Sequence, residues 1–177
     1  MSSKTKKFSI NNIDGMIDYL ESYKAEIQRK SMKFCNLLAD HGITVAMGSY
    51  GEFADKIHFK KAETDNGVII IVTDEKITKV WYSDKAMTNQ RSYQVSPMLL
   101  AEFGSGFEAR NKWGIDGVGQ GTMPNSYGHA FDVYGWYWYD EQGVKHHSKG
   151  EPPSYPLYAA TMSMLLEINE AAREAFK

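Results

Sequence analysis

The chain has 177 residues, of which 22 are acidic and 20 are basic, so its formal net charge is −2. This length suits one domain with its own core, and the nearly balanced charge excludes a general electrostatic attraction to nucleic acid or membranes. Cys35 is the one cysteine and cannot form an internal disulfide. With no apolar stretch like a signal peptide or a membrane span, we expect a soluble protein made in a cytoplasm.

The first ten residues are polar and include a small basic cluster, which predicts a flexible tail before a single domain at residues 11–177. A long helix is predicted from about Asn12 to His41, because apolar residues recur at helical spacing. They are Ile13, Ile17, Leu20, Ile27, Phe34, Leu37 and Leu38. Gly42 is expected to end this helix as a C-terminal cap. Such a helix would be about 40 Å long, so we expect part of it to pack against a neighbouring subunit.

A β region is predicted to follow the helix. Residues 43–47 are expected to form a short strand, and residues 48–51 a turn or flexible loop. An antiparallel meander comes next, since Asn66-Gly67 is a strong hairpin signal and Asp74-Glu75 is expected to turn the chain again. Its strands are residues 57–60, 68–73 and 77–82. The middle strand is nearly all apolar, so we expect it at the centre of the sheet.

The polar segment at residues 83–94 shows no pattern of core residues and is predicted to be an exposed loop. Ser96 and Pro97 then mark a helix start, with serine as the cap and proline in the first turn. This short helix is expected to end at Gly104. Residues 104–130 are rich in glycine and poor in core residues, which favours an assembly arm that becomes ordered against a partner subunit.

Aromatic residues dominate the predicted strand Phe131–Asp140. We expect it to pair with Val144–His147, and because rings occupy both of its faces, one face should meet another chain or the long loop. The final helix is predicted over Leu157–Phe176, with Pro156 in its first turn. The expected fold class is therefore α+β. An antiparallel β-sheet, made of the meander and an aromatic hairpin, is flanked by a long N-terminal helix and a C-terminal helix, with a long glycine-rich loop.

No group of residues has the spacing of a catalytic or metal-binding motif, so we expect no enzyme, no cofactor and no metal site. The run Gly117–Gly121 lacks the preceding strand, the following helix and the lysine of a phosphate-binding loop. His146 and His147 are adjacent on a predicted strand and therefore point to opposite faces. The alternative is a small ligand-binding or enzymatic module that uses the glycine run, His129 and the aromatic strand as a pocket.

Glu102 follows an apolar run and precedes Gly104, and the sequence leaves two interpretations of it open. In one, it is a surface acid at the end of a helix. In the other, it is partly buried and pairs with a basic residue across an interface. Asp74 and Glu75 are also acidic neighbours, but turns use such residues routinely.

Three features of the chain resemble the head–tail joining, or tail-completion, proteins of long-tailed bacteriophages. A glycine follows the long helix in His41-Gly42-Ile43. Residues 101–106 are similar to the family's aromatic–Glu–Phe–Gly–small–Gly motif, and residues 152–160 to its proline-led entry into the last helix. The Gly-Val-Gly-Gln-Gly-Thr loop and the Gly-Trp-x-Trp strand are typical of one subgroup. Residues 47–53 depart from the Pro-x-Asp-Thr-Gly-x-Leu segment that many members carry.

The resemblance implies a non-enzymatic virion protein, made in the host bacterial cytoplasm, that forms a homo-oligomeric ring at the phage neck or the top of the tail. Such a ring joins the portal–adaptor complex, or stopper, to the tail terminator and tail-tube proteins. Genomic DNA passes non-specifically through its lumen, and no membrane is involved. A minor capsid or tail-tube component is the alternative within this class. The residues expected at interfaces are Glu102, Phe103, Gly104, Ser105, Gly106, Trp113, Gly119, Trp136, Trp138, Tyr155 and Pro156.

Overall fold

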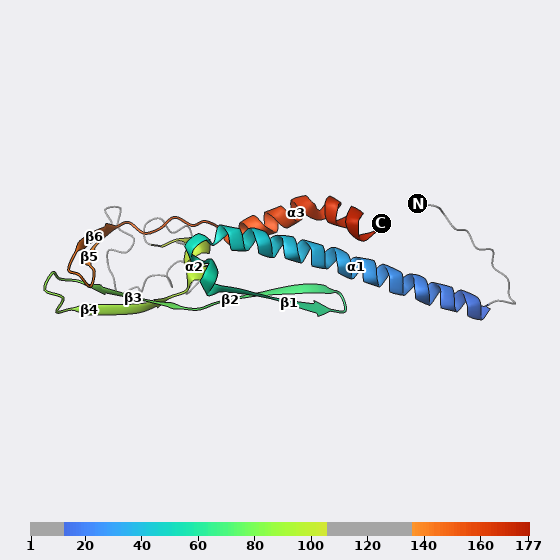
Figure 1. Ribbon diagram of the computed structural model, residues 1–177, viewed down its shortest axis with the longest axis horizontal. Coiled ribbons are helices and arrows are strands. Elements are labelled where there is room, and N and C mark those ends of the chain that lie inside the picture. The colour runs from blue at the N-terminus through green and yellow to red at the C-terminus, as the bar shows by residue number, and fades with distance from the viewer. Residues whose placement is uncertain (1–12, 106–135) are drawn as a thin grey trace.

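The computed structural model describes residues 13–105 and 136–177. The predicted N-terminal tail and nearly all of the predicted arm at 104–130 lie outside these residues, and so do Gly106, Trp113 and Gly119. The described chain is an elongated α+β structure, which confirms the predicted fold class (Figure 1). Its elements are α1 (Ile13–Ser49), the 3-10 helix η2 (Gly51–Lys56), β1 (Ile57–Thr64), β2 (Gly67–Asp74), β3 (Ile77–Tyr82), β4 (Gln90–Val95), α2 (Pro97–Phe103), β5 (Trp136–Tyr139), β6 (Lys145–Ser148) and α3 (Pro156–Ala175).

Helix α1 continues past Gly42 to Ser49, so the predicted helix end is wrong. Residues 43–47, predicted as a strand, are helical, and the predicted turn at 48–51 contains the end of α1 and the start of η2. Gly42 serves close helix packing, because a Cβ built on it would lie 2.5 Å from the Sδ atom of Met164 in α3. Packing against α3 therefore overrides the weak helix propensity of Gly42 and the β-branched residues after it.

Helices α1 and α3 pack side by side and run antiparallel (Figure 1). His41 Nε2 lies 2.6 Å from Ser163 Oγ, and Lys33 donates from Nζ to the Glu174 carbonyl at 3.2 Å. The predicted C-terminal helix and the place of Pro156 in its first turn are confirmed.

Strands β1 and β2 form the predicted hairpin, in a register that runs from Ile57↔Asp74 to Thr64↔Gly67. The hairpin lies along α1 on the side opposite α3 (Figure 1). Asn36 Nδ2 of α1 donates to Glu63 Oε1 at 2.8 Å, and Lys61 Nζ lies 2.6 Å from Asp40 Oδ1. These polar contacts tie the hairpin to the C-terminal half of α1.

The predicted three-stranded meander is wrong. Within the described residues, β1 and β2 form one two-stranded sheet, and β4-β3-β5-β6 form a second sheet in that order. The chain does not turn back at Asp74-Glu75, because the Glu75 N–H donates to the Lys56 carbonyl at 2.9 Å and prolongs the β1–β2 ladder. It runs on from β2 into β3 (Figure 1). The apolar strand β2 is therefore not central, and its Ile69 and Ile71 side chains are exposed.

The predicted loop at residues 83–94 is partly wrong as well, since Gln90–Val95 forms β4 and pairs antiparallel with β3. The sequence of this strand is polar and shows no hydrophobic alternation, because an edge strand of a thin sheet need not bury either face. The aromatic hairpin is confirmed for residues 136–148, where Trp138 pairs with His146. The predicted strand residues 131–135 lie outside the described part of the chain.

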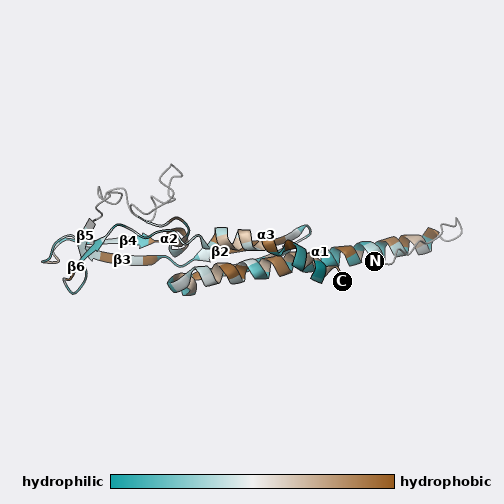
Figure 2. Cartoon of the chain, turned by 90° about the horizontal axis from the view of Figure 1, so that it is seen from above, coloured by the Kyte–Doolittle hydropathy of each residue, from teal (hydrophilic) through white to brown (hydrophobic). Residues whose placement is uncertain are grey.

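The core is small and lies where α1, η2, β1, α2 and α3 meet. Its buried residues are Ala46, Tyr50, Ile57, Ala101 and Ala160. Alanine dominates this set because the helices approach one another closely. Apolar residues also recur along the surfaces of the helices, up to the free end of α1 (Figure 2).

Candidate functional site

Two segments far apart in the sequence are joined by hydrogen bonds beside the core. We call residues 96–105 together with residues 150–158 the α2–α3 junction. The Ser105 N–H donates to the Glu151 carbonyl at 2.8 Å, and the Glu151 N–H donates to Ser105 Oγ at 3.0 Å. Ser105 is buried. The junction therefore contains both segments that carry the resemblance to tail-completion proteins.

Gly104 ends α2 with a φ of 72°, a backbone conformation that favours glycine. Its N–H donates to the Leu100 carbonyl at 2.8 Å. A Cβ at this position would collide with the Glu151 carbonyl and would lie 2.9 Å from the Pro153 nitrogen. Gly104 is required both by its own conformation and by the close approach of the second segment.

The end of α2 leaves carbonyl groups without partners inside the helix, as every helix end does. The Ala101 carbonyl accepts from the Ser154 N–H at 2.8 Å, from the Tyr155 N–H at 3.2 Å and from Ser154 Oγ at 3.2 Å. The chain that enters α3 thus caps the C-terminal end of α2.

Glu102 makes the reciprocal contact. Its carboxylate accepts from the Leu157 N–H at 2.9 Å and from the Tyr158 N–H at 3.3 Å, both in the first turn of α3. The residue at the N-terminal cap of α3, Tyr155, provides no side-chain cap and has a φ of 55°. Glu102 therefore replaces the missing cap and places a negative charge at the positive end of the α3 dipole.

This contact answers the question that the sequence left open. Glu102 is half-buried, and its described hydrogen-bond partners are backbone N–H groups, not a basic side chain. It lies in the last turn of α2, as the surface interpretation expected, but it caps a different helix. Neither interpretation foresaw this role.

The start of α2 is held in a similar way by the end of β2. The Leu99 N–H donates to Ser96 Oγ at 3.1 Å, which confirms Ser96 as the cap. The Ser96 hydroxyl in turn donates to the Asp74 carboxylate, which also accepts from the Met98 N–H at 3.3 Å. The acid predicted to form a turn instead fixes the start of α2.

Tyr50 lies in the core with 2% of its surface exposed. Burial raises the pKa of Tyr50 to about 12, and the negative charges of Glu102 and Asp74 act in the same direction. Its hydroxyl has no hydrogen-bond partner within the described residues. The phenol therefore stays neutral at physiological pH and serves packing.

The structure does not bring all the predicted interface residues together. Phe103, Tyr155 and Pro156 belong to the α2–α3 junction, whereas Trp136 and Trp138 lie on β5, apart from α2 (Figure 1). In the β5–β6 hairpin, the Trp138 ring stacks on His146 with their centroids 4.4 Å apart.

The turn of this hairpin is fixed by Asp140. Its carboxylate accepts from His146 Nε2 at 2.7 Å and from the Val144 N–H at 2.8 Å. The hydrogen bond from His146, followed by the one from the Val144 N–H, lowers the pKa of Asp140. His146 is thus paired with a carboxylate, and no cluster of metal-ligating side chains occurs within the described ranges.

Sequence reasoning missed two residues beside the junction: Asp74, which holds the start of α2, and Tyr50, which lies in the core with Ala101. For Asp74 the sequence did contain a signal, because an acid at the end of an apolar strand can bind the start of a helix. The sequence did not indicate which helix this would be. No sequence pattern indicated that Tyr50 is buried, since it lies between glycines in a segment that looks like a loop.

The contacts of the α2–α3 junction are those of a structural joint. Each helix end forms hydrogen bonds with backbone groups of the other segment. None of the helices in residues 13–105 and 136–177 is long and apolar enough to cross a membrane. Comparisons with protein-family models, with curated proteins and with solved structures found no significant match.

Proposed function

We propose that this protein is a non-enzymatic structural component of a long-tailed bacteriophage, which forms a ring at the neck and joins the head to the tail. The family resemblance suggests this location. The observation that carries the structural class is the amount of apolar side-chain surface that the elongated chain leaves exposed. Such surface is typical of proteins that bury it against other subunits.

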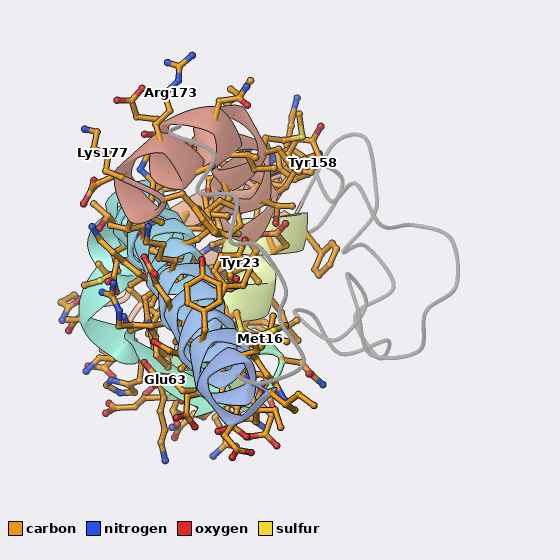
Figure 3. All side chains as sticks on the ribbon, turned by 90° about the vertical axis from the view of Figure 1, so that its right-hand side faces the viewer. Met16, Tyr23, Glu63, Tyr158, Arg173 and Lys177 are labelled. Atoms are coloured by element: carbon orange, nitrogen blue, oxygen red, sulfur yellow. The ribbon has the colours of Figure 1, made fainter. Side chains whose placement is uncertain are left out.

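Exposed apolar side chains lie on several elements, among them α3, β2 and α1. On α3, Leu166 is 81% exposed, and Tyr158 points away from the helix (Figure 3). On β2, Ile69 and Ile71 face outward, and the N-terminal end of α1 carries a further set. Surfaces on different sides of one chain favour heterologous contacts, which close into a ring when the rotation between subunits allows.

The α2–α3 junction would give this subunit its fixed shape. It holds the start of α3 to α2, beside the core, through hydrogen bonds to backbone groups. Ring assembly needs such a defined geometry, because an angular error in one subunit is repeated in each contact around the ring.

The partners expected for the ring are the adaptor or stopper on the head side and the terminator and tube on the tail side. DNA would pass through the lumen without being read. The net charge of −2 suits this role, because a strongly basic lumen would retain the DNA phosphates.

Removal of the gene from a phage that encodes it tests the proposal. We expect filled heads and complete tails that are not joined, and we expect the wild-type protein in purified virions at the stoichiometry of a ring. Electron microscopy of the lysate distinguishes the outcomes. Normal infectious particles would contradict the proposal, and defective heads or tubes would place the protein in the capsid or tail tube instead.

A further inference from the structure

The N-terminal end of α1 stands clear of the rest of the described structure (Figure 1). The contact between Lys33 and Glu174 joins α1 to the last turn of α3, and the contact between Asn36 and Glu63 joins it to the tip of the hairpin. N-terminal to these contacts, each of residues 13–29 except Met16 is exposed. The helix thus continues for about five turns beyond the elements that hold it.

This free end is not a uniformly polar helix. Ile13, Ile17, Leu20 and Ile27 are 56%, 49%, 57% and 38% exposed. Their spacing alternates between three and four residues if Lys24 is included, which is the spacing of the a and d positions in a coiled coil. We call these five residues the α1 seam. Figure 3, which views this end of α1, shows the neighbouring side chains Met16 and Tyr23.

We propose that the α1 seam pairs with the α1 seam of a second copy of this chain, parallel and in register. In this arrangement, Ile13, Leu20 and Ile27 occupy d positions, and Ile17 and Lys24 occupy a positions. The pairing is a property of the chain itself and does not depend on a location in the virion.

Flanking charges favour the parallel orientation. The seam is bordered on one side by Asp14 and Glu21 and on the other by Met16 and Tyr23. A parallel pair brings the acidic border of one helix beside the uncharged border of the other. An antiparallel pair brings the two acidic borders together, which is unfavourable because like charges repel.

Length and Lys24 both keep this pairing weak. The seam spans only about two heptads, fewer than the three or four that sustain an independent coiled coil. A lysine at an a position selects register at a cost in stability. The helix itself is already nucleated, because residues C-terminal to the seam are packed against α3 and the hairpin. We therefore expect association that depends on concentration.

Cysteine cross-linking of the purified full chain tests register and orientation. In a Cys35→Ser background, Leu20→Cys and Ile27→Cys should each give a disulfide-linked dimer under mild oxidation, seen on a non-reducing gel. Ser22→Cys is the matched control, because it is exposed on the opposite side of the same helical turns and should stay monomeric. In an antiparallel pair, at most one of the two seam positions lies opposite the same position of the second chain, so only one of the two variants would form the disulfide.

Sedimentation over a range of concentrations tests the energetics. Lys24→Ile should lower the dissociation constant at least about tenfold, because it replaces the one polar seam residue by a buried apolar side chain. Ile17→Lys should abolish the association while the circular dichroism spectrum stays unchanged.

Several results would overturn the proposal. The proposal would be wrong if the Lys24→Ile variant stayed monomeric at every concentration. Equal cross-linking of Ser22→Cys and Leu20→Cys, or association that Ile17→Lys does not weaken, would show that α1 pairs with something else or not at all. None of these results bears on whether the protein joins heads to tails, which the gene deletion decides separately.

Discussion

Glu102 links two helices that lie far apart along the chain, since its partner Leu157 in α3 is 55 residues further on. Its carboxylate accepts hydrogen bonds from two N–H groups at the start of α3. The neighbouring Ala101 carbonyl accepts hydrogen bonds from Ser154 and Tyr155, the two residues that precede α3. The last turn of α2 thus accepts hydrogen bonds from backbone N–H groups on both sides of the point where α3 begins. Small changes at this residue should therefore affect stability more than its partial exposure suggests.

Replacement of Glu102 by alanine should lower the free energy of unfolding by about 1–2 kcal/mol, because α3 loses its cap and the favourable charge at its N-terminus. Glu102→Gln keeps one acceptor oxygen and should lose about half as much. Urea denaturation followed by circular dichroism measures both. Glu170→Ala is the control, since it removes an exposed acid from α3, the helix that Glu102 caps. Equal stabilities of Glu102→Ala and the control would contradict the capping role.

Tyr50 predicts an alkaline limit to stability. Its pKa is raised from 10.0 to about 12 in the folded protein, so the folded state holds its proton where the unfolded state releases it. The stabilising contribution is fully present below pH 10 and is lost as the pH rises toward 12. Other tyrosines and lysines titrate in this range, and the comparison with Tyr50→Phe isolates the effect. Stability should fall less steeply in the variant between pH 10 and 12, and parallel curves would argue against it.

At the scale of elements, the close packing of α1 and α3 explains why the longest helix passes through a glycine. Gly42 lies against Met164, whereas Gly48 in the same helix has open space around its α-carbon. The two glycines therefore form a matched pair within one helix. One serves tertiary contact, and the other only lowers helix propensity.

Alanine substitution should separate these two roles. Gly48→Ala should raise the free energy of unfolding by up to about 1 kcal/mol through helix propensity. Gly42→Ala gains the same helix propensity, but its new methyl group forces the Met164 side chain to move, so its free energy of unfolding should be about 1–2 kcal/mol below that of Gly48→Ala. Thermal denaturation of both variants provides the measurement. Equal stabilities of the two variants would contradict a tight contact between Gly42 and the Met164 side chain.

For the whole molecule, the small core and the exposed apolar surface belong together. A thin, elongated chain cannot enclose the residues that a compact domain would bury, so Leu166, Ile69 and the α1 seam remain outside. Subunits of a larger assembly have this property, because the missing burial is supplied by their neighbours.

Leu166→Glu is therefore expected to leave folding intact and to impair assembly. The side chain is 81% exposed, so the free energy of unfolding should change by less than about 0.5 kcal/mol. Complementation of the deleted gene measures the effect on joining, and we expect infectious particles to fall by an order of magnitude or more. Asn169→Glu, which adds the same charge at a nearby exposed position, serves as the control. Full complementation by Leu166→Glu would show that this face of α3 does not take part in assembly.

The sequence by itself determined the elements whose signals are local. Ser96, Pro97 and Gly104 defined α2, because capping and glycine conformation act within a few residues. Asn66-Gly67 defined the hairpin, and Pro156 with the apolar repeat after it defined α3. The α+β class follows from these elements.

Only the tertiary structure decided how these elements are combined. The extension of α1 through Gly42 depends on Met164, and the break between the two sheets depends on where Asp74 finds its partners. Both partners are distant in the sequence, so no local pattern contains them. The same holds for Glu102, whose role became clear only when the fold brought the start of α3 within hydrogen-bond distance of its carboxylate.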